Sequence, residues 1–181
     1  HFDPTDGDVE FAEIDTPFYQ FNKEMTVETW VNIQSTDIGA GLGQATYAVD
    51  NMTSNVWLIH FNNINSITFY CNDNGTWRAA TDTAISPGWH HIAGVASADK
   101  LEFYLDGALR VTGTGISTGI VNNSASVINF GKDVRNGFRF CKAAFDEVRI
   151  WNRALCHAEI KHNYNAELSL PQNGLVGYYQ F

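Results

Sequence analysis

Short runs of β-branched and aromatic residues recur along most of the chain, and residues that favour tight turns separate them. Val, Ile, Thr, Phe, Tyr and Trp favour strands, whereas Asn, Asp, Gly and Ser favour turns. Many short strands at close spacing are typical of an all-β fold, so we expect an antiparallel β-sandwich. The expected strands are residues 8–14, 25–33, 45–49, 56–62, 66–71, 76–81, 89–95, 101–105, 125–130, 144–151 and 175–181.

Three connections between these runs can be assigned. Asp106-Gly107 lies between two apolar runs within residues 100–110, and this pair tolerates the positive φ angles of a tight hairpin turn. Residues 154–164 alone place apolar residues at near-helical spacing, which predicts one short helix. Residues 113–124 are rich in Gly and Asn, and we expect a surface loop that buries little.

Composition limits the class of protein. The 181 residues are 44% hydrophobic and 17% charged, which is enough for one packed core, so we expect a single domain over residues 1–181. The net charge of −9 would repel a phosphate backbone, so nucleic acid is not an expected partner. No apolar run approaches the roughly 18 residues of a membrane span, so membrane insertion is not expected.

The cysteines and the first residue leave alternatives open. Cys71, Cys141 and Cys156 allow one disulfide with a free thiol, or three buried thiols. None lies in a C-x-x-C pair, so neither a thiolate zinc site nor a thioredoxin-like motif is expected. The chain opens at His1 without an initiator Met, so either a targeting segment has been removed or the chain is a module of a longer protein. We favour the second alternative.

Four sequence stretches occur in an order found in one known family. They are residues 25–32 (MTVETWVN), 87–95 (PGWHHIAGV), 101–107 (LEFYLDG) and 145–155 (FDEVRIWNRAL). They resemble the motifs of laminin G-like and pentraxin-like jelly rolls in the concanavalin A-like lectin/glucanase superfamily. Residues 1–9 are similar to the family's opening, but Pro4 and Asp8 stand where its Gly and Tyr are usual. The resemblance implies a concanavalin A-like jelly roll with one short helix.

The closing segment carries a second resemblance. Residues 173–181 are similar to a segment that joins such modules in large secreted proteins of Bacteroidetes-like bacteria, which implies a secreted or cell-surface location and neighbouring modules. In those relatives a second Cys follows the helical one, and the nearby position here is Ala166, which leaves Cys156 without that partner. Residues 175–181 are too apolar for a solvated linker, so we expect a strand beside the opening strand, with at least two aromatic side chains buried.

Catalytic patterns are incomplete. Glucanases of the superfamily use an E-x-D-x-x-E strand, and the nearest match is Glu13 and Asp15 with Phe18 at the third position. The third carboxylate is missing and Pro17 interrupts the strand, so we expect no glycoside hydrolysis. His90 and His91 lie in a core strand, where we expect one to face inward with a hydrogen bond and the other outward.

An acid-rich chain with Asp and Asn in its loops favours calcium, a hard cation that takes oxygen ligands. The resemblance implies that the first and last strands lie side by side, so Asp3, Asp6 and Asp146 could share a structural ion. The alternative is that Asp146 caps a turn or pairs with an arginine, either Arg149 or Arg153.

A second calcium site is implied by the pentraxin-like relatives, in which an Asp-Asn pair and an acidic loop hold an ion that bridges to ligand. The matching residues here are Asp50, Asn51, Asp133 and Asn136. Two cations, Lys132 and Arg135, lie in the same loop and lower the charge available to a metal. The alternative is a solvated turn in which Asn and Gly adopt positive φ.

Aromatic side chains can stack on the apolar face of a sugar ring. Trp30, Trp89 and Trp151 lie inside strand motifs and are expected in the core, whereas Trp57 and Trp77 are candidate ligand-binding residues. Residues 56–61 are apolar at nearly every position, so burial of Trp57 in a central strand is the alternative. Arg78 follows Trp77 and could add a charged hydrogen bond to a glycan.

These observations predict a non-catalytic module that binds carbohydrate or mediates adhesion, with calcium as cofactor and glycans or a cell-surface protein as partners. Fold resemblance alone does not decide function, because this sandwich also hosts enzymes and spacers. The alternatives are a structural spacer or protein-protein module in a tandem surface protein, and a glycoside hydrolase.

Overall fold

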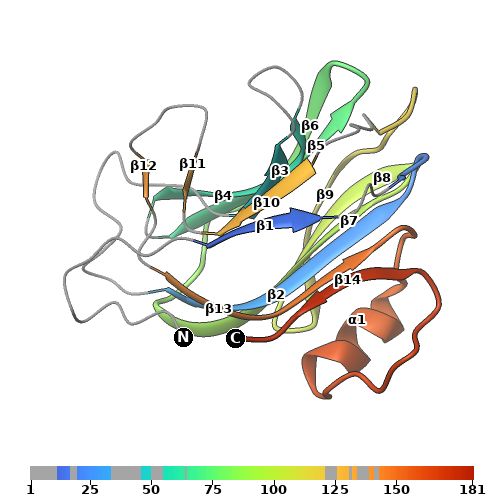
Figure 1. Cartoon of the computed structure of the whole chain (residues 1–181). Helices are drawn as coiled ribbons and strands as arrows, with labels where there is room; N and C mark the ends of the chain where they lie inside the picture. Colours follow the sequence, from blue (N-terminus) through green and yellow to red (C-terminus); the bar gives the residue numbers. More distant parts are fainter. Residues whose placement is uncertain are drawn as a thin grey trace.

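In the residues that the structure describes, the fold is a sandwich of two six-stranded antiparallel sheets, seen as two layers in Figure 1. The computed structural model describes residues 12–16, 20–33, 46–49, 55–63, 65–120, 126–130, 132–133, 139–140 and 143–181. Sheet A contains, in spatial order, β1 (Ala12–Thr16), β10 (Ser126–Phe130), β3 (Thr46–Val49), β4 (Asn55–Asn63), β5 (Ser66–Asp73) and β6 (Thr76–Asp82). Sheet B contains β14 (Leu175–Tyr179), β13 (Ala143–Trp151), β2 (Met25–Ile33), β7 (Gly88–Ala96), β8 (Lys100–Leu105) and β9 (Ala108–Thr114).

The expected all-β sandwich is confirmed, and the described residues contain one short helix, as expected. The Asp106-Gly107 turn joins β8 to β9, and both residues have the positive φ that this turn requires, 51° and 73°. A separate pair of two-residue strands, β11 (Lys132–Asp133) and β12 (Arg139–Phe140), was not expected from the sequence.

The core lies between the sheets and follows the two-residue period of the strands. Met25, Val27, Val31 and Ile33 of β2 are fully or almost fully buried, because alternate residues of a strand face the same side. The sheets approach closely at Gly94 of β7, where an added Cβ would lie 2.3 Å from the ring of Phe69. A side chain at Gly94 would therefore push the sheets apart.

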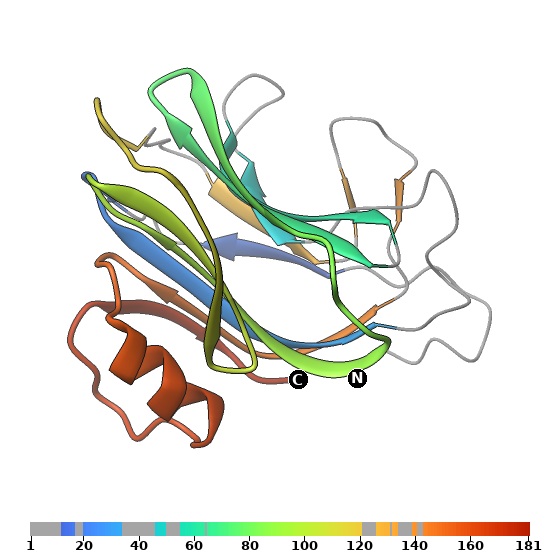
Figure 2. The same ribbon diagram turned by 180° about the vertical axis from the view of Figure 1, so that it is seen from behind.

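A second, smaller apolar cluster lies on the outer face of sheet B, under helix α1 (His157–Tyr164). Figures 1 and 2 both show α1 on the side of sheet B that faces away from sheet A. Ile160 of the helix and Leu155 before it pack against Val95 and Trp151. The helix starts three residues later than the expected stretch, after its N-cap residue Cys156, whose N–H donates to the Glu159 carboxylate at 2.8 Å. In the described residues, no helix is long and apolar enough to cross a membrane.

The closing segment forms a strand, as expected, but in a different place. β14 pairs with β13, at the edge of sheet B, whereas β1 pairs with β10 in sheet A. The expectation that β14 lies beside the opening strand is therefore wrong for the described part of that strand. Tyr178 and Tyr179 are partly buried, and Tyr179 packs against the core between the sheets, whereas Phe181 is 42% exposed. The expected burial of two aromatic side chains is therefore only partial.

The segment after β9 buries more side chains and makes more hydrogen bonds than the expected surface loop would. Ile116 and Ile120 are buried, and the carboxylate of Asp73 accepts hydrogen bonds from the backbone N–H groups of Ser117, Thr118 and Gly119 at 2.7–3.1 Å. Residues 121–124 of the expected loop lie outside the described residues. A carboxylate of β5 thus ties this connection to sheet A.

The thiols described here do not pair. Cys71 is buried and Cys156 is exposed, and both are free, whereas Cys141 lies outside the described residues. Burial raises the pKa of the Cys71 thiol far above its usual range. The alternative of three buried thiols is excluded by the exposed Cys156.

Candidate functional site

An aromatic row crosses the outer face of sheet A. It consists of His60 on β4, Tyr70 on β5 and Trp77 on β6, which are diagonal neighbours in the strand register. The ring centroids of His60 and Tyr70 are 6.3 Å apart and those of Tyr70 and Trp77 are 6.2 Å apart, both edge to face. Trp77 is 39% exposed, so its ring lies at the surface, as the sequence predicts.

A polar row runs beside the aromatic row on the same face. Asn62 donates from Nδ2 to the Thr68 hydroxyl at 2.7 Å, and the Thr68 and Thr81 hydroxyls are hydrogen-bonded at 2.8 Å. Asn62 also bonds through Oδ1 to the His60 ring at 2.8 Å, so the two rows are linked. Asn62 and Thr81 are exposed, whereas Thr68 is buried between them.

Ala79 lies between Trp77 and Thr81 on this face of β6 and is exposed. Its methyl group is too small to cover the flank of the Trp77 ring. The face therefore combines an exposed aromatic ring with neutral amide and hydroxyl groups, which is the chemistry that recognises a neutral polyhydroxylated ring.

Arg78 does not contribute to this face. Successive residues of a strand point to opposite sides, and Arg78 donates to Asp73 from Nε at 3.0 Å and from Nη2 at 2.6 Å. The expected partnership of Trp77 with Arg78 at one ligand is therefore corrected: Arg78 neutralises a buried carboxylate. Burial raises the pKa of Asp73, but hydrogen bonds from Thr118, Arg78 and Ser117 outweigh burial and hold the pKa well below its usual range.

The burial of the other tryptophans differs in part from the expectation. Trp57 is fully buried between the sheets, so its assignment as a ligand-binding residue is corrected in favour of the core alternative. Trp151 is buried as expected, on the helix side of sheet B. Trp89, expected in the core, is 49% exposed at the start of β7, and Trp30 is only half-buried.

Most of the expected calcium ligands lie outside the described residues, namely Asp3, Asp6, Asp50, Asn51 and Asn136. Asp133 is in β11, and its side chain is not described. Asp146 accepts hydrogen bonds at Oδ1 from the N–H groups of Glu147 at 2.7 Å and Phe181 at 3.1 Å, as in the turn-capping alternative. Within the described part of the chain, no three His, Cys, Asp or Glu side chains are grouped so that they could hold a metal ion.

The remaining candidates are the two carboxylates of the glucanase-like pattern and the paired histidines. Glu13 and Asp15 are on β1, which ends at the residue before Pro17, and their side chains are not described. His90 contacts Asp106 through Nδ1 at 2.9 Å and the Ser86 carbonyl through Nε2 at 2.9 Å. His91 is buried on the helix side of sheet B.

A comparison with known families decides the relationship. A family model described as the concanavalin A-like lectin/glucanases superfamily matches residues 3–161. The chain belongs to this superfamily. The matched residues stop inside α1, yet β14 lies beyond them and still pairs with β13, so the folded unit of this superfamily member extends further than the match.

Solved structures share the superfamily fold at low identity. The binding domain of botulinum neurotoxin serotype D has a TM-score of 0.66 and 12% identity over 86% of this chain and 40% of that chain. The serotype G binding domain has a TM-score of 0.63 and 15% identity over 87% of this chain and 44% of that chain. The binding domain of neurotoxin DC, solved in complex with rat synaptotagmin II, has a TM-score of 0.61 and 14% identity over 79% of this chain and 35% of that chain.

This chain therefore spans about two fifths of the length of those toxin domains. The likeness shows the fold alone. No match was found in the comparison with curated proteins.

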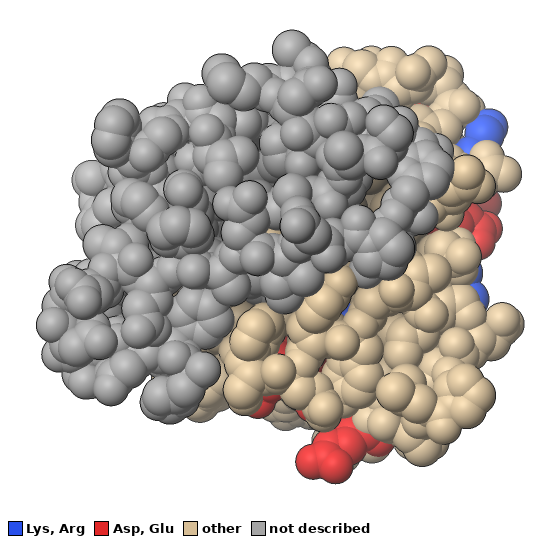
Figure 3. All heavy atoms as spheres, in the orientation of Figure 1, with Lys and Arg blue, Asp and Glu red and all other residues tan. Residues whose placement is uncertain are grey.

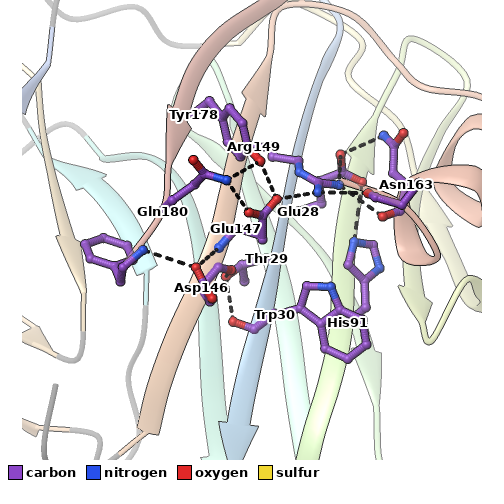
Figure 4. Close-up of polar contacts among 12 residues, drawn as sticks. Glu28, Thr29, Trp30, His91, Asp146, Glu147, Arg149, Asn163, Tyr178 and Gln180 are labelled. Carbon is purple, nitrogen blue, oxygen red and sulfur yellow. Dashed lines mark hydrogen bonds and ion pairs between the residues drawn. The ribbon is translucent and has the colours of Figure 1, made fainter. Parts of the chain in front are cut away.

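Sequence reasoning missed a buried polar network between sheet B and α1 in this superfamily member, drawn in Figure 4. Glu28 is fully buried, and its Oε1 accepts from Trp151 Nε1 at 3.1 Å and Asn163 Nδ2 at 2.8 Å. Arg149, 1% exposed, donates to the carbonyls of Asn163 and Ala166 at 3.1 and 3.2 Å. Charged residues within apolar strand motifs are the signal that could have revealed this network.

The network continues to β14. Arg149 Nη2 lies 2.5 Å from Glu147 Oε2, and Glu147 also accepts from the Tyr178 hydroxyl and from Gln180 Nε2. Burial raises the pKa of Glu147, but hydrogen bonds from Tyr178, Gln180 and Arg149 outweigh burial and leave the pKa below its usual value. The network holds the last strand and the helix on sheet B.

Proposed function

We propose that this protein is a non-catalytic binding module and that the outer face of sheet A, around Trp77, binds a neutral carbohydrate. The observation that carries the proposal is the 39% exposed ring of Trp77 beside the exposed Asn62 amide and Thr81 hydroxyl, which the buried Thr68 hydroxyl links. Stacking buries aromatic area while the amide and hydroxyl groups bond to sugar hydroxyls. The side chains described around Trp77 on this face are those of one histidine and of neutral residues, which supports a neutral ligand.

The proposed setting is a secreted or cell-surface protein in which this domain mediates adhesion. The superfamily includes both lectins and glucanases by name, so membership alone does not separate binding from hydrolysis. The missing third carboxylate after Glu13 and Asp15 supports binding without turnover.

Replacing Trp77 with Ala is expected to weaken glycan binding about tenfold or more while the melting temperature stays the same, because the ring is on the surface. Binding would be measured on a glycan array and then by calorimetry with the best ligand. Trp89→Ala, which removes an exposed tryptophan from the other sheet, is the matched control and should bind glycan normally. Absence of any glycan ligand would favour the spacer alternative, and sugar release from β-glucans would favour the hydrolase.

We also propose that calcium binds the folded protein, on the strength of its acid excess and of the family resemblance. An ion that binds only the folded state adds RT ln(1 + [L]/Kd), which is about 2.7 kcal/mol at a hundredfold excess over Kd. The melting temperature of dialysed protein should rise with added calcium and fall again with EDTA. Equal melting temperatures in calcium and in EDTA would contradict this proposal.

A further inference from the structure

A pocket of about 270 Å³ opens on the outer face of sheet B, where the end of α1 meets a bulge in β13. Its walls include two aromatic side chains, Trp30 and Tyr164, whose rings are stacked with centroids 5.5 Å apart. Its lining also includes three carboxylates, those of Asp146, Glu147 and Glu167. Asp146 is directly opposite Trp30 in the register of β13 and β2, so an acid and a ring share the same wall.

The pocket carries a net negative charge, because Arg149 is the one cation in its lining and already pairs with a carboxylate. Arg149 lines the pocket but is 1% exposed, and its terminal nitrogens bond to Glu147 and to the carbonyls of Asn163 and Ala166. Glu167 is exposed and makes no ion pair with any described residue. Two of the three carboxylates, those of Asp146 and Glu167, thus have no cation partner among the residues that the structure describes. Figure 3 shows red acidic atoms at the lower edge of the described surface.

An exposed tryptophan extends this surface along sheet B. Trp89 is opposite Asn32, and Asn32 follows Trp30 by two residues on the same side of β2, so Trp89 and Trp30 are diagonal neighbours. Trp89, at 49%, is the most exposed aromatic side chain among the described residues. Its surface continues the aromatic wall of the pocket away from α1.

We propose that this aromatic and acidic surface is a docking site for a basic segment of a partner protein, which places an arginine side chain in the pocket. A guanidinium group is planar, stacks on aromatic rings, and donates N–H groups to carboxylates. The uncompensated carboxylates and the net charge of −9 supply the charge complementarity. A neutral glycan carries no positive charge to pair with these carboxylates, so the ligand proposed for this surface differs from that of the Trp77 face.

The probe is a capped peptide in which arginine alternates with glycine, titrated into the ¹⁵N-labelled full chain. The indole resonances of Trp30 and Trp89 are expected to shift in a saturable way, and a peptide with glutamine in place of each arginine should shift neither. Trp89→Ala and Glu167→Gln are each expected to weaken binding about two- to fivefold, and together about tenfold. Both residues are exposed, so these variants retain the fold.

The matched control for charge is Asp99→Asn, which removes one exposed acid at the opposite end of β7. The matched control for aromatic area is Trp77→Ala, which should bind the peptide as the wild type does. Equal weakening by Asp99→Asn and Glu167→Gln would show attraction by net charge only and would overturn the docking site. Equal binding of the glutamine peptide, or shifts confined to other tryptophans, would overturn it as well. Loss of glycan binding in Trp77→Ala tests the proposed function separately.

Discussion

Replacing Arg149 with Met is expected to lower the free energy of unfolding by about 3–5 kcal/mol, because removal of one member of a buried ion pair leaves its partners uncompensated. Glu28 is fully buried and lies 3.8 Å from Arg149 through Oε1, while Glu147 lies 2.5 Å away. The carbonyls of Asn163 and Ala166 would also lose their donor. Urea denaturation followed by far-UV circular dichroism would measure the loss.

Lys161→Met removes the same charge from the exposed surface of α1 and is the control, with an expected change within about 0.5 kcal/mol. If Arg149→Met unfolds at the same urea concentration as this control, the network does not hold α1 and β14 on sheet B. If Arg149→Met fails to fold at all, the same urea measurement is made on Arg149→Lys, which retains the charge and loses the bidentate geometry. A lowered free energy of unfolding is again expected.

Asp73→Asn is expected to lower the free energy of unfolding by about 2–3 kcal/mol, because an amide nitrogen would face hydrogen-bond donors in place of a carboxylate oxygen. In the wild type, Oδ1 accepts from the Thr118 N–H and hydroxyl, both at 2.7 Å, and Oδ2 accepts from Ser117 and Arg78. Faster amide hydrogen exchange at residues 117–119 would accompany the loss, because these N–H groups bond to Asp73.

The pH dependence of stability should change with the same substitution. The pKa of Asp73 is lowered on folding, so its contribution is present above the unfolded pKa of about 3.9 and is lost as the pH falls toward the folded pKa. Wild-type protein should therefore lose stability below about pH 4 more steeply than Asp73→Asn. The exposed Asp99→Asn, compared over the same pH range, should behave as the wild type. Parallel pH profiles for wild type and Asp73→Asn would contradict this role of Asp73.

The order of strands along the chain could be predicted because it depends on local patterns. Strand residues alternate every two positions, and Asp106-Gly107 encodes its own turn, so β2 and the β8–β9 hairpin follow from neighbouring residues alone. The partner of β14 could not be predicted this way. Either sheet edge can accept an apolar strand, and the choice is made by distant contacts such as that of Tyr178 with Glu147.

The candidate site was partly predictable for the same reason. Trp77 lies beside Gly75 and polar residues, which indicate a surface position, and the structure leaves it exposed. Trp89 lies in a strand with the apolar pattern of a core strand. It is on the outer face of sheet B, however, and α1 covers only part of that face, so Trp89 stays exposed. Exposure there depends on how far a helix from another part of the chain reaches, which strand alternation does not encode.

Sequence by itself determined the all-β class, most strand limits, the helix at residues 157–164 and the superfamily, because strand period, turn chemistry and family motifs are local properties. Tertiary structure alone decided which charges are paired. Glu28 and Asn163 are 135 residues apart in sequence, and Asp73 and Ser117 are 44 apart, yet each pair is hydrogen-bonded. A buried carboxylate is stable only where donors converge on it, and donors from distant segments converge only after the sheets and the helix have packed.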